Sequence, residues 1–250
     1  MLFQTLSTVA ALAATVSAHG YVTNLTAGGV DYTGYLINTD PYTVPTPARV
    51  VRPVQGNGPI TDVTLIDIQC GGYTAGGING SSPANLTAGP VAAGSDVEIA
   101  WSLWPSSHFG PVITYMAKCP DAGCQTYLPG TDAVWFKVQE EGRTGTSDVW
   151  ATTPLMTAGG TASYTIPSCL AAGDYLVRHE IIAVFTAVTY PGAQFYPSCH
   201  QISITGSGSS TGPTEKVAFP GAYTPTSAGV TFDNSANATY TIPGPTLFTC

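Results

Sequence analysis

Hydrophobic and polar residues alternate in several short segments of the chain. Over residues 96–104 every second residue is Val, Ile, Trp or Leu, and the residues between them are mostly small or charged. This period-2 pattern is typical of a strand with one buried face. Four further segments have strand character: residues 133–139, 162–166, 175–187 and 200–205.

Turn-forming residues separate these segments. The chain contains 28 Gly and 20 Pro, and no long run has the 3.6-residue period of an amphipathic helix. The pattern predicts an all-β fold, an antiparallel immunoglobulin/fibronectin-like β-sandwich with long loops. Residues 206–213 (GSGSSTGP) have the composition of a linker, but too few residues follow for a second core, so we expect a loop within one domain.

The first eighteen residues are uncharged and mostly apolar, and they end in the small residues Val16-Ser17-Ala18. This is the pattern of a secretory signal peptide, and the segment is short for a membrane span. We therefore expect residues 1–18 to be removed, leaving a single domain of residues 19–250 that is secreted and extracellular. No other segment has the character of a transmembrane helix, so we expect no membrane partner.

The charge pattern narrows the choice of partners. The net charge is −8 and only 9% of residues are charged, which argues against binding to a phosphate backbone, so we expect no nucleic-acid partner. A neutral surface such as a polysaccharide suits this composition better than an ionic one.

Six cysteines in a secreted chain predict three disulfides. Cys119 and Cys124 flank a short loop that a local bond could close, whereas the other cysteines must pair over long distances. Four sequons fit extracellular surface loops and are candidate glycosylation sites: Asn24, Asn79, Asn85 and Asn237.

Two of the four histidines are candidate metal ligands. Cleavage after Ala18 would give His19 a free α-amino group, which loses its proton readily near neutral pH and can chelate a metal together with the imidazole. An imidazole from His108 would complete a set of three nitrogens. A nitrogen-rich tetragonal site favours Cu(II), so copper is the expected metal.

Several motifs along the whole expected mature chain carry a family resemblance. They are His19-Gly-Tyr-Val, Trp104-Pro-Ser-Ser-His108-Phe-Gly-Pro-Val, Ala193-Gln-Phe-Tyr-Pro-Ser-Cys199, Phe219-Pro-Gly-Ala-Tyr223 and Tyr240-Thr-Ile-Pro-Gly-Pro245. In this order, after a processed histidine, they resemble the lytic polysaccharide monooxygenases of auxiliary activity family 9, a fungal and typically cellulose-active group.

The resemblance implies a histidine brace for one copper ion that cycles between Cu(II) and Cu(I). Its ligands would be the amine and Nδ1 of His19 and Nε2 of His108, with the Tyr196 hydroxyl at an axial position. Gln194 matches the family's glutamine that hydrogen-bonds the oxygen species. The implied disulfides are Cys70 with Cys199, Cys119 with Cys124, and Cys169 with Cys250.

The implied reaction is copper-dependent oxidative cleavage of β-1,4-glucan chains. Its partners would be an insoluble polysaccharide, with cellulose the expected one, and an external electron donor, and the oxidant would be O2 or H2O2. The protein is expected to be a monomer. The family binds its substrate on a flat face where aromatic rings stack on sugars, and Tyr42 and Tyr223 are the candidates by position. A hydrolase would need two carboxylates about 5 to 9.5 Å apart, and few acidic residues lie near the motifs.

One position departs from the family pattern. Members usually carry a histidine nine residues before the glutamine, in an Ala-Leu-His run, where this chain has Ala183-Val184-Phe185. A phenyl ring can neither donate nor shuttle a proton, and loss of a partner around a metal site commonly costs about 10- to 100-fold. The alternative is therefore a copper- and carbohydrate-binding member with weak or redirected activity. We expect His179, too far along the strand to substitute, and His200 to be structural.

Overall fold

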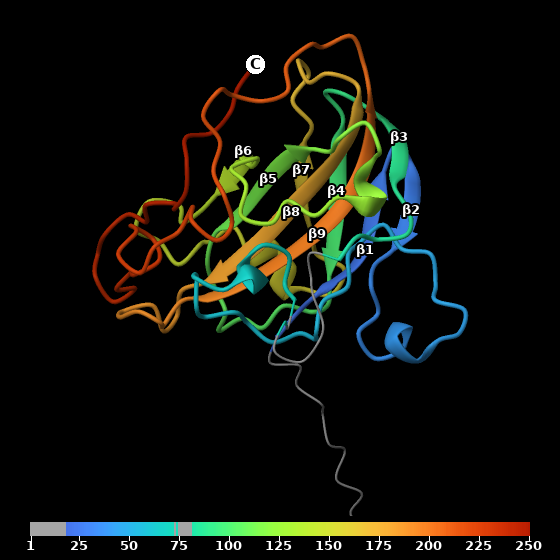
Figure 1. The fold of residues 1–250 in the computed structure, drawn as a ribbon. Helices are drawn as coiled ribbons and strands as arrows, with labels where there is room; N and C mark the ends of the chain where they lie inside the picture. Colours follow the sequence, from blue (N-terminus) through green and yellow to red (C-terminus); the bar gives the residue numbers. More distant parts are fainter. Residues whose placement is uncertain (1–18, 73, 75–81) are drawn as a thin grey trace, which may run out of the picture.

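The computed structural model describes residues 19–72, 74 and 82–250, and these residues form two β-sheets packed face to face (Figure 1). The smaller sheet has the strand order β2-β1-β4-β7, and the larger has the order β3-β9-β8-β5-β6. The strands are β1 (Val22–Ala27), β2 (Val30–Thr33), β3 (Ala88–Ala92), β4 (Asp96–Trp101), β5 (Val112–Lys118), β6 (Phe136–Glu141), β7 (Thr161–Thr165), β8 (Gly173–Ala183) and β9 (Gln194–Thr205).

The predicted all-β sandwich is confirmed, with one exception to its antiparallel pairing. β3 runs parallel to β9 and pairs with the second half of that strand. The remaining secondary structure in the described residues is 3-10 helix, and none of it is long and apolar enough to cross a membrane. These turns are η1 (Asp40–Tyr42), η2 (Ile66–Ile68), η4 (Cys124–Thr126) and η5 (Thr153–Met156).

The main core lies between the two sheets. β4 shows the expected alternation, since Val97 and Ile99 are buried inside while Asp96 and Glu98 face solvent. Leu25 of β1 joins the same core. The outer face of the smaller sheet is left polar and exposed, because no loop packs over the outward residues of β2, β4 and β7 among the described part of the chain.

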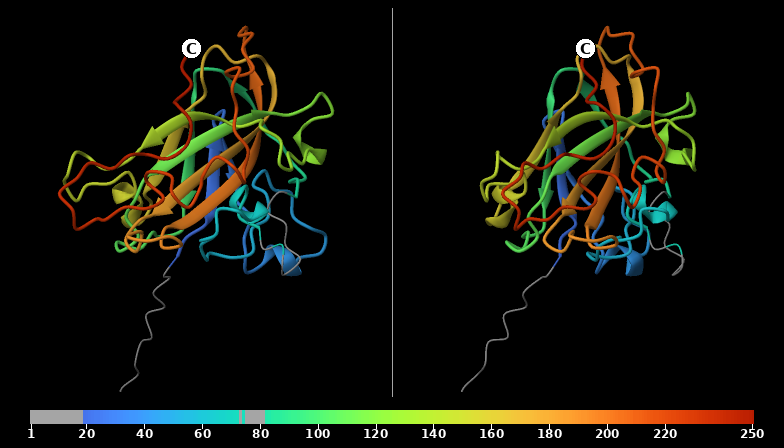
Figure 2. Two further views of the ribbon diagram at one scale, coloured as in Figure 1. Left: turned by 60° about the vertical axis from the view of Figure 1, so that its left-hand side comes forward. Right: turned by 90° about the vertical axis from the view of Figure 1, so that its left-hand side faces the viewer.

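A second core covers the outer face of the larger sheet. It is formed by outward side chains of β5, β8 and β9 together with loop residues that pack on them. Figures 1 and 2 show loops and the red C-terminal segment lying along this side of the molecule. As a result β5, β8 and β9 are buried on both faces. Examples from this second core are Ile113, Leu176, Phe195, Phe219 and Tyr223.

A buried ion pair fastens loops to β8 within the second core. Arg178 and Glu180 are both fully buried, and the guanidinium Nη1 lies 2.5 Å from a carboxylate oxygen. Arg178 also donates to the carbonyl of Ile68 at 2.8 Å, and Tyr223 donates its hydroxyl proton to Glu180. The pair thus joins the η2 loop and the C-terminal segment to one strand.

Three disulfides tie the remaining loops, and they are the pairs that the family resemblance implies. Cys70 is bonded to Cys199, Cys119 to Cys124, and Cys169 to Cys250. The segment of linker composition is held against the body, since Ser210 donates its backbone N–H to the carbonyl of Cys169 at 3.0 Å.

Candidate metal centre

His19, His108 and Tyr196 come together from three separate parts of the chain. His19 precedes β1, His108 lies in the loop between β4 and β5, and Tyr196 belongs to β9. The ring centroids of His19 and His108 are 5.3 Å apart with an interplanar angle of 89°, and the Tyr196 ring is 6.0 Å from His19 and 6.3 Å from His108.

The local fold fixes His108 through its backbone and one ring nitrogen. Its N–H donates to the carbonyl of Pro105 at 3.0 Å, and its own carbonyl accepts from the indole Nε1 of Trp104 at 2.7 Å. Nδ1 lies 3.0 Å from the hydroxyl oxygen of Ser107, while Nε2 is buried and has no hydrogen-bond partner. Burial, followed by the nearby His19, lowers the pKa of His108, and the neighbouring Gln194 side chain acts in the opposite direction. A neutral imidazole with an unpartnered Nε2 is a metal-binding group.

Trp104 also supports the neighbouring residues of the site. A Cβ placed on Gly20 would lie 2.8 Å from a ring carbon of Trp104, so only glycine allows the first described residues to lie this close to the indole. The Trp104 ring also meets the Tyr196 ring edge-on, with centroids 4.9 Å apart. The Trp-Pro-Ser-Ser-His motif marked this loop, but nothing in the sequence assigned separate roles to Trp104 and Ser107.

Tyr196 and Gln194 are hydrogen-bonded partners on one side of β9. The Tyr196 hydroxyl donates to Oε1 of Gln194 at 2.6 Å. Burial raises the pKa of Tyr196, so the phenol stays protonated at neutral pH. The strand geometry therefore places a neutral hydroxyl and an amide beside the two histidines.

Phe185 lies directly against the candidate ligand His108. The two ring centroids are 4.5 Å apart with an interplanar angle of 44°. The position at which the family usually has a histidine is thus in contact with the site, and it presents an apolar ring there.

The two candidate substrate tyrosines have different positions. The side chain of Tyr42 is 82% exposed in η1, so its ring is free to contact a surface. The prediction for Tyr223 is wrong, because this residue is 3% exposed and its hydroxyl binds Glu180 in the second core. A ring enclosed in this way cannot stack on a sugar.

The other two histidines are structural, as expected. Nδ1 of His179 lies 2.9 Å from the hydroxyl oxygen of Thr114, and Nε2 of His200 lies 2.9 Å from the hydroxyl oxygen of Tyr164. Both rings are buried. No group of three or more His, Cys, Asp or Glu side chains that could hold a metal occurs in the described residues, and the candidate site itself brings together two of these side chains, His19 and His108.

Comparison with known proteins shows the family of this chain. Residues 19–241 match the family model described as Auxiliary Activity family 9 (formerly GH61). The chain belongs to auxiliary activity family 9. The family match begins at His19, the residue at which the candidate metal centre begins.

Two relatives in this family are similar over nearly their whole length. The chain is 66% identical over 250 residues to AA9 family lytic polysaccharide monooxygenase F of Botryotinia fuckeliana (strain B05.10), covering 100% of both chains. It is 51% identical to AA9 family lytic polysaccharide monooxygenase B of Malbranchea cinnamomea, with 95% of this chain and 94% of the relative covered. The protein is accordingly an AA9 lytic polysaccharide monooxygenase, a copper-dependent enzyme that acts on polysaccharide.

A solved structure also shares the fold. A cellulose-active polysaccharide monooxygenase from M. thermophila superimposes with a TM-score of 0.78 at 31% identity, covering 92% of this chain and 99% of the other. The sandwich with its loop-borne site is thus the AA9 architecture.

Proposed function

We propose that the protein is secreted, loses residues 1–18, and holds one copper ion in a brace formed by His19 and His108. The amine and Nδ1 of His19 and Nε2 of His108 would be the nitrogen ligands, and the Tyr196 hydroxyl would lie beside the metal. The single observation that carries this proposal is the buried, unpartnered Nε2 of His108 beside the His19 ring. Three nitrogen donors in this arrangement fit copper.

Copper bound here would supply Cu(II)/Cu(I) redox chemistry, using an external electron donor and O2 or H2O2. The protein's own residues prepare the surroundings. Ser107 fixes the orientation of the His108 ring, and Gln194 holds the neutral Tyr196 hydroxyl in place. The Gln194 amide is also the polar group available to hydrogen-bond a small oxygen species at the site.

The proposed substrate is a β-1,4-glucan, with cellulose as the first choice. The low fraction of charged residues suits a neutral polymer, and the M. thermophila neighbour is described as cellulose-active. The exposed ring of Tyr42 is the candidate for stacking on a sugar ring. We assign the protein as an extracellular monomer.

The sequons fit an extracellular glycoprotein. Asn237 is exposed and Asn24 is half-buried on β1, while Asn79 lies outside the described residues. Asn85 holds neighbouring backbone groups, since its Oδ1 accepts from the N–H of Arg49 at 2.8 Å. We propose these four asparagines as glycan acceptors.

A second candidate function rests on Phe185. Because its ring packs on His108 where the family usually offers a proton-donating imidazole, the protein would bind copper and carbohydrate but turn over slowly or on another polymer. The two candidates differ in the amount of oxidised product per bound copper, not in copper binding.

Mass spectrometry of soluble products distinguishes these functions. Correctly processed, copper-loaded protein is incubated with cellulose and ascorbate, with a copper-free sample as control. Oxidised oligosaccharides that require both copper and reductant support the monooxygenase and identify the oxidised carbon. Plain reducing ends would indicate hydrolysis, and absence of product with copper bound would favour the second candidate or another polysaccharide.

A further inference from the structure

Residues 51–60 form an arch that runs along β9. At one end Val51 pairs with His200, and the N–H of Arg52 donates to the carbonyl of Cys199 at 2.8 Å. At the other end Ile60 and Phe195 exchange two backbone hydrogen bonds of 2.9 and 2.8 Å. Both ends of the arch are therefore fixed to the strand that carries Tyr196.

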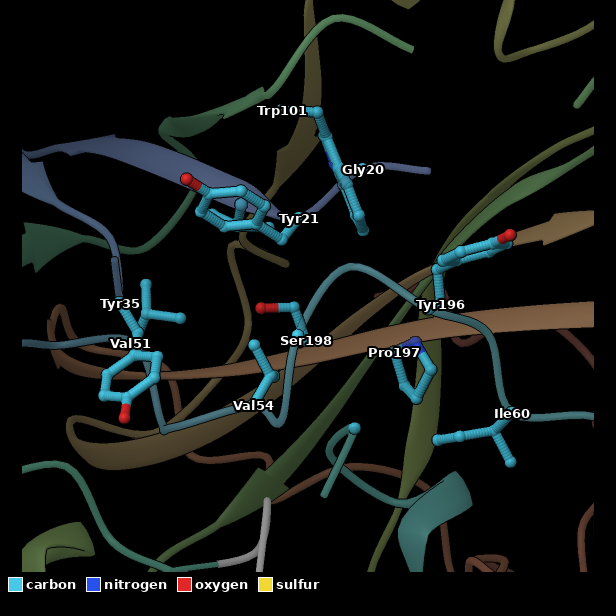
Figure 3. A pocket seen from close by; sticks show the side chains of 14 residues that line it. Gly20, Tyr21, Tyr35, Val51, Val54, Ile60, Trp101, Tyr196, Pro197 and Ser198 are labelled. Atoms are coloured by element: carbon cyan, nitrogen blue, oxygen red, sulfur yellow. The ribbon is translucent and has the colours of Figure 1, made fainter. Parts of the chain in front are cut away.

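A small cavity separates this arch from the beginning of the domain. Its volume is about 20 Å³, room for about one water molecule. Figure 3 shows Gly20, Tyr21, Tyr196 and Pro197 around it, and Gly56 and Gly58 of the arch complete this part of the wall. Close packing therefore does not immobilise the terminal segment on this side.

The opposite side of the terminal segment is held firmly. Gly20 lies on the Trp104 ring, and the carbonyl of Tyr21 accepts a 2.9 Å hydrogen bond from the N–H of Ser102. These contacts fix residues 20 and 21, the backbone that follows His19 directly.

Asn57, at the top of the arch, supplies a contact to His19 itself. Its side-chain Nδ2 donates to the His19 carbonyl oxygen at 3.3 Å. We propose that Asn57 is a positioning residue for the copper brace, an inference that rests on the proposed copper function. After cleavage His19 has no preceding peptide, so rotation about its Cα–C bond sets how its amine and Cβ point relative to the rest of the backbone. A hydrogen bond to its carbonyl fixes that rotation.

The test measures copper binding and the Cu(II) electron paramagnetic resonance spectrum of protein processed at His19, without polysaccharide. Asn57→Ala should weaken copper affinity about 10- to 100-fold, as loss of an outer partner of a metal ligand commonly does, and should change the hyperfine splitting. Asn57→Asp keeps the size of the side chain but removes the hydrogen-bond donor, so its copper affinity and spectrum should resemble those of Asn57→Ala. Asn57→Gln keeps the donor on a longer arm and should recover part of the affinity.

Asn85→Ala is the matched control, made in a host that does not attach N-linked glycans. The Asn85 amide also binds backbone, at Pro47 and Arg49, but not at the terminus, so copper affinity and spectrum should stay at the parent values. Unfolding temperatures of the copper-free variants identify any that fail to fold. The Asn57 variants that do fold then decide whether Asn57 positions His19. A parent protein that binds no copper overturns the proposed function itself. A parent that binds, with folded Asn57 variants that match it in affinity and spectrum, overturns only the role of Asn57.

Discussion

At the scale of single residues, the groups around His108 have distinct effects on one imidazole. Ser107 occupies Nδ1, Phe185 packs on the ring, and Nε2 remains available. The hydroxyl contact determines which nitrogen can bind a metal, whereas the phenyl contact determines how much proton-donating chemistry surrounds that metal. In the proposed function, metal binding and turnover therefore depend on different neighbours of the same candidate ligand.

Phe185→His should raise the rate of oxidised product formation by about 10- to 100-fold, because an imidazole at this position can donate a hydrogen bond and a proton where the phenyl ring cannot. The rate is measured by chromatography of oxidised oligosaccharides at equal copper loading. Phe185→Leu serves as the apolar control and should stay near the parent rate. An unchanged rate in Phe185→His would show that Phe185 does not limit this enzyme.

Residue chemistry also shows what sequence inference can and cannot reach. The expected processing made His19 and His108 candidate ligands, because few residue types can bind copper, and the structure brings their rings together. Tyr223 was misassigned, since a motif reveals that a tyrosine is present but not which way its ring points. Asn57 carried no signal, because its contact to His19 exists only through the folding of a long loop.

At the scale of elements, burial on one or two faces explains part of what could be predicted, although β8 was found despite being buried on both faces. β4 and β7 alternate because only one face of the smaller sheet is buried. β5 was missed, and only the second half of β9 was found, because loops bury both faces of these strands and remove the period-2 pattern. β1 and β2 are short and pair mainly with each other and with β4, which a local pattern does not reveal.

The Cys70–Cys199 bond fastens the η2 loop to β9, three residues after Tyr196. Replacing both cysteines with serine should lower the free energy of unfolding by about 2–4 kcal/mol, because the bond closes a long loop. The same change at Cys119 and Cys124, only five residues apart, should cost less. Urea unfolding measures both, and equal losses would contradict the loop-length argument. Copper paramagnetic resonance should change only in the first variant.

At the scale of the whole molecule, two buried neutral histidines make the free energy of unfolding depend on pH. Burial, followed by the positive charge of Arg178, lowers the pKa of His179 to about 3. Burial and then His179 lower the pKa of His200 to about 3. In the unfolded chain each of these histidines takes up a proton near pH 6.5, whereas in the folded chain it does not. Their contribution to the free energy of unfolding is therefore complete above about pH 6.5 and decreases as the pH falls toward 3.

Each histidine should therefore reduce the free energy of unfolding by about 1.4 kcal/mol per pH unit once the pH is well below the unfolded value. Urea unfolding of copper-free protein between about pH 7 and pH 5 measures this slope. His179→Gln removes one titrating group and should make the slope shallower by one proton. A variant with the parent slope would show that His179 takes up its proton without unfolding.

The second core has a consequence for how long the enzyme works. The Arg178–Glu180 pair and the Cys70–Cys199 bond hold the η2 loop and the C-terminal segment on the outside of a sandwich that has its own interior between the sheets. Heat can loosen this outer layer, and with it the surroundings of the copper ligands, while the two sheets stay paired. The working lifetime of the catalyst is then set by the outer layer. A sample that keeps its full β-sheet circular dichroism signal can already be inactive.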